Sequence, residues 1–433
     1  MTASVTDFTE AATDPKQSCF PVGATPSRSA WVTATTGTAG IIVVKALKGT
    51  FYDTVISGYS GTCDALNERA CNDDAHGKSA SEVQLKALPG ELYRFMITDK
   101  GNGAFANLEL GVGLRTLDAA AVKCQVAIER ILSGYADTVT SGTQACAAAM
   151  LRCIEERPSD STCIAKSAAV CGRSRDTITL AQVRGGVAIR KACEGKGANY
   201  DAMTSTGLIG YDNVVGECYA RLGIDAGDVG GLLECLFREQ QCDVAETVRV
   251  VMPRVGEMMT LAGIEPDSTS CMSVAPGRGG LGDPRVGVAM DKCLSDLAQN
   301  SRKIFATART ADFACVNAAL KCRPVVGFIT DQCRLKAQDV CDRALVKRNS
   351  AIMGASVSQA CSQVDFATVI KSAEGGGVGA IEGVCEIFGS GPLGSLDDYE
   401  KCVGVIARKS ARSLVSFAVP RADELMALIG RTL

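Results

Sequence analysis

Cysteine is the residue type in this chain with the most potential for chemistry, because it is abundant and could form disulfides or bind metals. The 433 residues include 21 cysteines and a single histidine, His76. No two cysteines lie closer than seven residues, whereas zinc, iron–sulfur, haem and thioredoxin-like sites use closely spaced pairs such as C-x-x-C. The spacing excludes those classes of site and favours structural disulfides, which persist outside the reducing cytosol. The sequence therefore predicts an exported protein, extracellular or at the cell surface, and we expect its export signal to lie outside the sequence given.

Candidate catalytic residues are scarce. A Ser-His-Asp or Cys-His arrangement needs a histidine base, and His76 lies in a predicted turn. The segment 277–282 matches G-x-G-x-x-G, but Pro276 precedes it and Pro284 follows it, so the strand and helix of a dinucleotide site are missing. We interpret this segment as a flexible linker and predict a protein that is not an enzyme.

Composition and charge exclude further classes of protein. Hydrophobic residues make up 46% of the chain, which excludes bulk disorder and is enough for a sizeable core. There are 45 basic and 48 acidic residues, so no general polycationic surface for nucleic acid is expected. No stretch approaches the roughly 18 apolar residues of a membrane helix. The sequence predicts no nucleic-acid partner and no transmembrane segment.

Short strands are predicted over residues 28–116. Alternating runs separated by turn signals occupy 30–33, 40–44, 54–56, 91–97 and 107–110. Short strands about ten residues apart favour a β-sandwich. Further pieces in order are Ser29-Ala30-Trp31-Val32 before Gly40, the segment 53–61, Cys71-Asn72-Asp73-Asp74, and the segment 89–93. These residues resemble the bacterial pre-peptidase C-terminal domain, a small β-sandwich appended to many secreted proteins.

A calcium ion is the cofactor hypothesis for this region. Relatives of the resembled domain in secreted proteases are associated with calcium, although the resemblance does not fix the ligands. Loop residues of an exported domain that offer hard oxygen ligands are Asp53, Asn72, Asp73 and Asp74.

The rest of the chain is helical and repeats itself. From Cys124 the intervals to the next cysteines are 22, 7, 10, 8, 22, 25 and 17 residues, and from Cys293 they are 22, 7, 11, 8, 20, 24 and 17. The segment 253–261, which begins Pro-Arg, recurs as 420–428. This pattern indicates a tandem duplication. The units are also similar to cysteine-rich, alanine-rich helical repeats of secreted bacterial proteins, on Cys124-Gln125-Val126-Ala127-Ile128, and this likeness implies no activity.

The predicted fold class is multidomain β + α, an N-terminal β-sandwich followed by two tandem disulfide-stapled all-α units. The domains expected are an N-terminal tail (1–27), the β-sandwich (28–116), helical unit 1 (117–271), a Gly/Pro linker (272–288) and helical unit 2 (289–433).

Cysteine spacing also predicts connectivity. Seven residues separate the first two cysteines of a hairpin and eight the last two, so each pair lies on one helix face. With a turn at 156–160, antiparallel pairing joins Cys146 to Cys171 and Cys153 to Cys163. The second copy joins Cys315 to Cys341 and Cys322 to Cys333.

Each copy holds four more cysteines, for which three connectivities are open. We favour Cys124–Cys193 with Cys218–Cys235, and Cys293–Cys361 with Cys385–Cys402. Cys242 and Cys271 have no counterparts and are expected to pair with each other, and Cys63 and Cys71 flank a short turn that suits a local bridge. The odd cysteine is then Cys19, for which an intermolecular bond, a free thiol and a different pairing within the chain all stay open.

Three functions follow from these features. The first is an extracellular structural protein that forms or decorates a filament or sheath, with a homopolymer or a cell-surface molecule as partner. The N-terminal tail could then add a strand to the sheet edge of a neighbouring subunit. The second is a secreted module that binds polysaccharide or protein, with a helical spacer. The third is a hydrolase that uses carboxylates.

Overall fold

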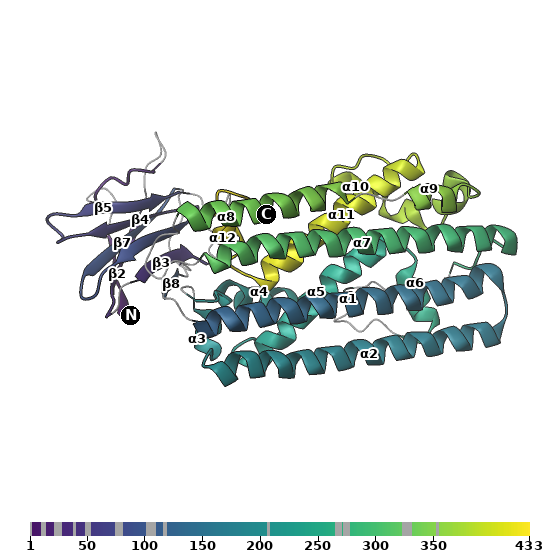
Figure 1. Cartoon of the computed structure of the whole chain (residues 1–433), viewed down its shortest axis with the longest axis horizontal. Helices are drawn as coiled ribbons and strands as arrows, with labels where there is room; N and C mark the ends of the chain where they lie inside the picture. Colours follow the sequence, from purple (N-terminus) through teal and green to yellow (C-terminus); the bar gives the residue numbers. More distant parts are fainter. Residues whose placement is uncertain are drawn as a thin grey trace.

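An N-terminal β region precedes an elongated helical region (Figure 1). The computed structural model describes residues 2–9, 14–20, 28–37, 40–47, 53–73, 81–100, 110–115, 119–205, 208–264, 271, 278–322, 331–351 and 355–433. Among these residues the chain forms ten disulfides, one in the β region and nine in the helical region. No helix of the described ranges is both long and apolar enough to cross a membrane.

Two antiparallel sheets form the β region. Their strands are β1 (Thr2–Thr9), β2 (Ser29–Thr35), β3 (Gly40–Ala46), β4 (Thr54–Ser60), β5 (Asn67–Asn72), β6 (Glu82–Ala87), β7 (Leu92–Asp99) and β8 (Leu110–Arg115). One sheet has the order β1-β2-β7-β4-β5 and the other β6-β3-β8. Val32 and Phe95 of the first sheet share one core cluster with Ile42 and Leu85 of the second. Alternate residues of facing strands therefore build the core, as a period of two requires.

The described part of the segment 1–27, residues 2–9 and 14–20, packs on the β region and is not a free tail, which corrects the prediction. β1 pairs antiparallel with β2, so the N-terminus adds a strand to its own sheet. Downstream, the amide of Gln17 donates to the carbonyl oxygens of Val55 (3.4 Å) and Met96 (3.3 Å), and the Trp31 indole donates to Asp14 (3.3 Å). The missed signal is alternation in residues 2–6, where polar Thr2, Ser4 and Thr6 alternate with Ala3 and Val5.

A long hairpin opens the helical region. α1 (Ala119–Glu156) and α2 (Ser161–Cys193) are joined at the predicted turn, and the Asp160 side chain caps α2 by accepting from the amides of Thr162 and Cys163. An N-cap aspartate satisfies amides that have no partner within the helix. This cap fixes where the second helix begins.

Further helices follow, and several have matching lengths. They are η3 (Glu194–Lys196), α3 (Tyr200–Thr204), α4 (Asp212–Leu222), α5 (Val229–Val251), α6 (Val255–Leu261), α7 (Pro284–Lys321), α8 (Asp331–Ser350), α9 (Ala355–Cys361), η4 (Phe366–Ile370), η5 (Val378–Ile381), α10 (Glu382–Ile387), α11 (Leu396–Ala418) and α12 (Ala422–Leu428). α1 and α7 both have 38 residues, α5 and α11 both have 23, and α6 and α12 both have 7. Element lengths thus follow the repeat seen in the cysteines.

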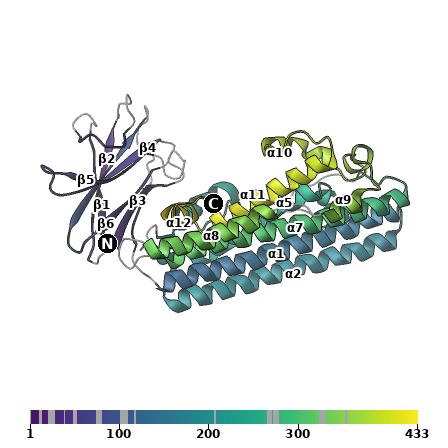
Figure 2. The same ribbon diagram turned by 45° about the horizontal axis from the view of Figure 1, so that its top comes forward.

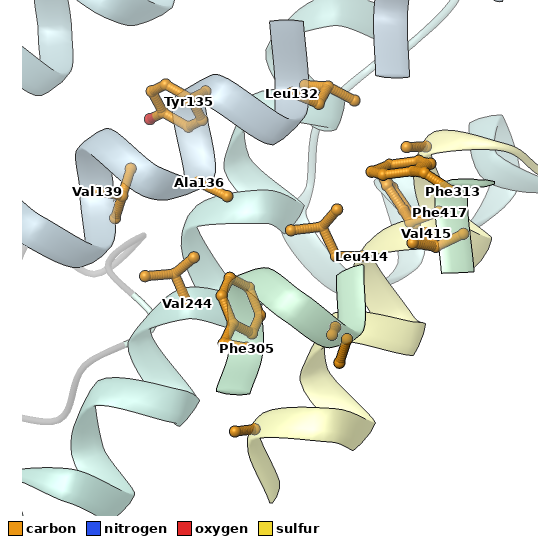
Figure 3. Close-up of a cluster of buried hydrophobic side chains, with 14 of the residues drawn as sticks. Leu132, Tyr135, Ala136, Val139, Val244, Phe305, Phe313, Leu414, Val415 and Phe417 are labelled. Carbon is orange, nitrogen blue, oxygen red and sulfur yellow. The ribbon is translucent and has the colours of Figure 1, made fainter. Parts of the chain in front are cut away.

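One continuous hydrophobic core runs through the whole helical region. Figure 3 shows side chains of α1, α5, α7 and α11 meeting in it, among them Ala136, Val244, Phe305 and Leu414. All four are fully buried or nearly so. The long helices of residues 119–261 therefore share their core with those of residues 284–428, and burial of apolar area couples the two sets.

Residues 278–288 are not a flexible linker, which corrects a second prediction. The amides of Arg278 and Leu281 donate to the side chains of Glu257 (2.7 Å) and Glu155 (3.0 Å), and α7 already begins at Pro284. Residues 272–277 lie outside the described residues.

The β region contacts the end of the helical region. Lys45 of β3 forms an ion pair with Asp212 of α4 at 3.0 Å, and both side chains are mostly buried. The sheet β6-β3-β8 therefore lies beside the helix ends (Figure 2).

Candidate functional site

Disulfides hold each helical hairpin at two levels. Cys146–Cys171 and Cys153–Cys163 join α1 to α2, with Cα–Cα distances of 4.5 and 5.7 Å. In the second hairpin, Cys315–Cys341 and Cys322–Cys333 join α7 to α8 at 4.3 and 5.6 Å. These are the pairs that the helical spacing predicts.

The other helical cysteines also form the favoured pairs. Cys124–Cys193 joins the N-terminal part of α1 to the end of α2, and Cys293–Cys361 joins the N-terminal part of α7 to the end of α9. The remaining pairs are Cys218–Cys235, Cys385–Cys402 and Cys242–Cys271. Every cysteine of the helical region is therefore in a disulfide.

The β region differs from the prediction. Cys19 bonds to Cys71 with a Cα–Cα distance of 5.7 Å, so the predicted Cys63–Cys71 bridge is wrong and Cys19 is not available for an intermolecular bond. The Ser18 amide donates to the Glu68 carboxylate at 3.2 Å, which brings Cys19 onto β5. Cys63 lies in the turn between β4 and β5 as an exposed free thiol.

The proposed calcium ligands surround a lysine. The Lys100 ammonium lies 2.9 Å from Asp53 and 2.6 Å from Asp73, and these two carboxylates raise its pKa against the opposing effect of burial. Asn72 accepts from the Glu82 amide at 3.2 Å. Asp74 and His76 lie outside the described residues. Within the described ranges, no group of three His, Cys, Asp or Glu side chains could hold a metal ion.

Arg254 connects the two halves of the helical region, which we call the first half (residues 119–271) and the second half (residues 278–433). Its guanidinium binds Glu257 (2.8 Å) and Glu155 (2.9 Å), and the side chains of all three are at most 5% exposed. The same guanidinium donates to the carbonyl oxygens of Gly279, Glu374 and Gly375, the last at 2.9 Å. An arginine contributed by α6's N-cap is thus bound by a loop about 120 residues later in the chain.

Arg421 makes a corresponding contact in the opposite direction. It binds Glu424 at 2.8 Å, its side chain is 4% exposed, and it donates to the carbonyl oxygen of Leu208. Arg421 lies 167 residues after Arg254, and Gly375 lies 167 residues after Leu208. Each half therefore inserts its arginine into the equivalent loop of the other half.

Two glycines make room for these arginines. Gly210 has φ +90°, and a Cβ built there would lie 2.9 Å from Cγ of Arg421. Gly377, again 167 residues later, has φ +72°, and its Cβ would lie 2.8 Å from Cγ of Arg254. The left-handed conformation and the close contact both require glycine.

Two buried tyrosines add to the reciprocal contact. The Tyr211 hydroxyl donates to the Ala418 carbonyl oxygen (2.6 Å) at the end of α11. The Tyr399 hydroxyl donates to the carbonyl oxygens of Val250 (2.9 Å) and Val251 (3.0 Å) at the end of α5. Carbonyl groups at helix C-termini have no partner within the helix, so a partner from the other half satisfies them.

Two acids also bridge the halves, the buried Glu129 and the half-buried Asp243. Glu129 of α1 accepts from Asn317 of α7 at 2.7 Å, and Asp243 of α5 accepts from Ser413 of α11 at 3.3 Å. Burial raises the pKa of Glu129 and that of Asp243 each to about 7, and the hydrogen bonds only partly oppose it. The interface therefore contains groups that titrate near neutrality.

A cavity of about 280 Å³ lies in the first half, between α1, α2 and α5. Its walls combine apolar groups such as Ile178, Ala245 and Met259 with Arg175 and Arg238, and no acidic side chain is among the described lining residues. In the second half the positions equivalent to Thr143 and Ile178 hold Asp312 and Arg348, which form an ion pair at 2.8 Å. The cavity is thus a feature that distinguishes the halves.

Sequence reasoning missed the arginine network. The signal was present, because Pro-Arg-x-x-Glu occurs at 253–257 and again at 420–424. A charged pair kept at the same offset in two apolar helix ends indicates a buried ion pair. Comparison with protein-family models, with curated proteins and with solved structures finds no match to the chain.

Proposed function

We propose that this protein is an extracellular structural subunit that assembles with copies of itself, forming or decorating a surface filament or sheath, and that it is not an enzyme. The observation that carries the proposal is the reciprocal insertion of Arg254 and Arg421, which locks the helical region into one body. A rigid body with fixed ends suits a subunit that repeats along an assembly and carries mechanical load.

The architecture proposed for this role is a β-sandwich followed by two tandem helical units derived by duplication. Two antiparallel sheets with a common core support the sandwich, and its relation to the pre-peptidase C-terminal domain rests on the motifs quoted above. Matched helix lengths and reciprocal contacts at one sequence offset support the duplication.

The disulfides support the extracellular location. Ten bridges are typical of an oxidising environment, and each contributes roughly 2–4 kcal/mol when unstrained. Such stabilisation suits a protein that persists outside the cell, where chaperones do not refold it.

Purified, unreduced protein tests the proposal. We expect sedimentation velocity to show species that grow with protein concentration, and negative-stain images to show regular oligomers. A single monomeric species at every concentration, with no oligomers in native material, would contradict self-assembly. Non-reducing mass spectrometry of the same sample should find the ten bridges.

The cavity favours a second function, a secreted binding module. Its apolar walls and its two arginines suit a small apolar anion, and its size lies at the lower end of ligand sites. Anilinonaphthalene sulfonate is a suitable probe. We expect Arg175→Ala to weaken its binding severalfold and Lys166→Ala, on the same helix but away from the cavity, to leave it unchanged; equal effects of both would reject the site.

A further inference from the structure

An apolar stripe runs along the outer face of α2. Leu180, Val183 and Val187 follow helical spacing and are 46%, 59% and 64% exposed. The helix carries six lysine and arginine side chains against one aspartate, and all six are exposed. We call this face the basic stripe. Its basic members are Lys166, Arg173, Arg184, Arg190 and Lys191, whereas Arg175 lines the cavity.

The basic stripe is unused within the described part of the chain. None of its five basic side chains forms an ion pair with a described residue. The second half lacks an equivalent, because α8 ends at Ser350, the position that corresponds to Leu180. Counted back from Cys361, which matches Cys193, Val357 takes the place of the buried Ile189, and Ala355 takes that of Val187. One chain therefore carries one such stripe.

A complementary surface lies at α10 and the start of α11. The segment 372–400 contains six acidic residues and no lysine or arginine. Ile387, at the end of α10, is 81% exposed, more than any other large hydrophobic side chain among the described residues. We call this the acidic surface; its charged members are Glu374, Glu382, Glu386, Asp397, Asp398 and Glu400.

The two surfaces lie on opposite sides of the molecule. Both views place α10 at the top and α2 at the bottom, with the bundle core between them (Figures 1 and 2). They cannot meet within one chain. Each combines exposed apolar groups with a net charge, and the signs are opposite. The basic stripe is positive although α2 also carries Asp176, and the acidic surface is negative although Lys371 pairs with Glu382 and Lys401 with Asp397.

Taking these observations together, we infer that the basic stripe of one copy docks on the acidic surface of the next copy. The contact is heterologous, so repetition produces an open chain of subunits instead of a closed dimer. Burial of Leu180, Val183, Val187 and Ile387 supplies affinity, and the opposite charges supply orientation. The inference rests on the proposed self-assembly and specifies its interface.

Single-surface variants of the full chain test this interface. Val187→Asp blocks the basic stripe and Ile387→Asp blocks the acidic surface. We expect each to reduce the self-association constant at least tenfold, while Val346→Asp on α8, at a valine 70% exposed and outside both surfaces, leaves it unchanged. Circular dichroism confirms that each variant is folded.

Mixing gives the decisive measurement. A Val187→Asp chain keeps its acidic surface and an Ile387→Asp chain keeps its basic stripe, so an equimolar mixture should form one-to-one dimers and nothing longer. Raising salt from about 0.05 to about 0.5 M should weaken the contact, because exposed charges are screened within a Debye length of about 10 Å or less.

Other outcomes are distinguishable. Wild-type chains that never associate would overturn the proposed assembly itself. Association that survives both substitutions would overturn this interface and leave assembly standing. Binding of phosphatidylserine vesicles that is lost in Val187→Asp, with no effect of Ile387→Asp on any association, would overturn the interface in favour of a membrane partner for the basic stripe.

Discussion

Replacement of Arg254 by methionine should destabilise the helical region more than any single surface change. Methionine keeps most of the side-chain volume but leaves the carboxylates of Glu155 and Glu257 buried at 0% and 2% exposure without their counter-charge. Removal of one partner from a buried ion pair typically costs about 3–5 kcal/mol. The lost hydrogen bonds to the carbonyl oxygens of residues 279, 374 and 375 add to this cost. We therefore expect the free energy of unfolding to fall by at least about 3 kcal/mol.

Urea unfolding with the disulfides intact measures this loss. Arg249→Met is a matched control, because Arg249 pairs with Glu246 at 2.8 Å but both side chains are more than a third exposed. Surface pairs contribute about 0–1 kcal/mol, so the control should stay close to wild type. Equal losses in the two variants would refute the view that the network holds the halves together.

The pH dependence of stability provides an independent check on the same variant. Burial raises the pKa of Glu155, and Arg254 opposes that shift. Without the arginine, the folded state holds its protons more strongly than the unfolded state does, so stability falls as pH rises past the ordinary carboxyl range. The deficit of Arg254→Met should therefore shrink when unfolding is measured near pH 4 and grow at pH 7. A deficit independent of pH would show that lost packing, and not unpaired charge, causes it.

Three further outcomes are expected. The pKa of Glu129 is raised from 4.5 to about 7, so its ionisation costs stability as pH rises through that window, and Glu129→Gln should be more stable than wild type by about 1–3 kcal/mol at pH 8 and equal to it at pH 4, by thermal unfolding. Thiol labelling of unreduced protein should modify one residue, Cys63, and Cys63→Ser should abolish labelling without changing stability. Gly210→Ala should cost more than about 1 kcal/mol because of its positive φ and its contact with an arginine, whereas Gly216→Ala, in open space within α4, should stabilise by roughly 0.5–1 kcal/mol.

Local spacing in the sequence was sufficient for the helical hairpins. Cys146 and Cys153 share a helix face at two turns, and Asp160 is a strong N-cap, so pairing and turn position follow from helix geometry alone. The same reasoning failed for Cys63 and Cys71. Closeness in sequence favoured a bridge between them, but the segment that carries Cys19 crosses the sheet and places Cys19 beside Cys71 on β5.

Contacts between the halves could not be predicted from one copy at a time. Arg254 contacts the second half through the carbonyl oxygens of Glu374 and Gly375, and a backbone oxygen leaves no mark on the sequence. Likewise, Tyr211 and Tyr399 are ordinary core residues by pattern, and their hydroxyl partners lie 207 and 148 or 149 residues away. Long-range polar contacts of this kind depend on the assembled fold.

Exchange of arginines between the halves has a consequence for how the protein behaves on dilution. Arg254 and Arg421 each find their receiving carbonyl in the opposite half, so neither half can complete its own polar contacts. Because one polypeptide supplies both, the two partners are always present in equal number and at a high effective concentration. The two halves therefore stay joined at any protein concentration, and the outer surface of each half can differ from that of the other.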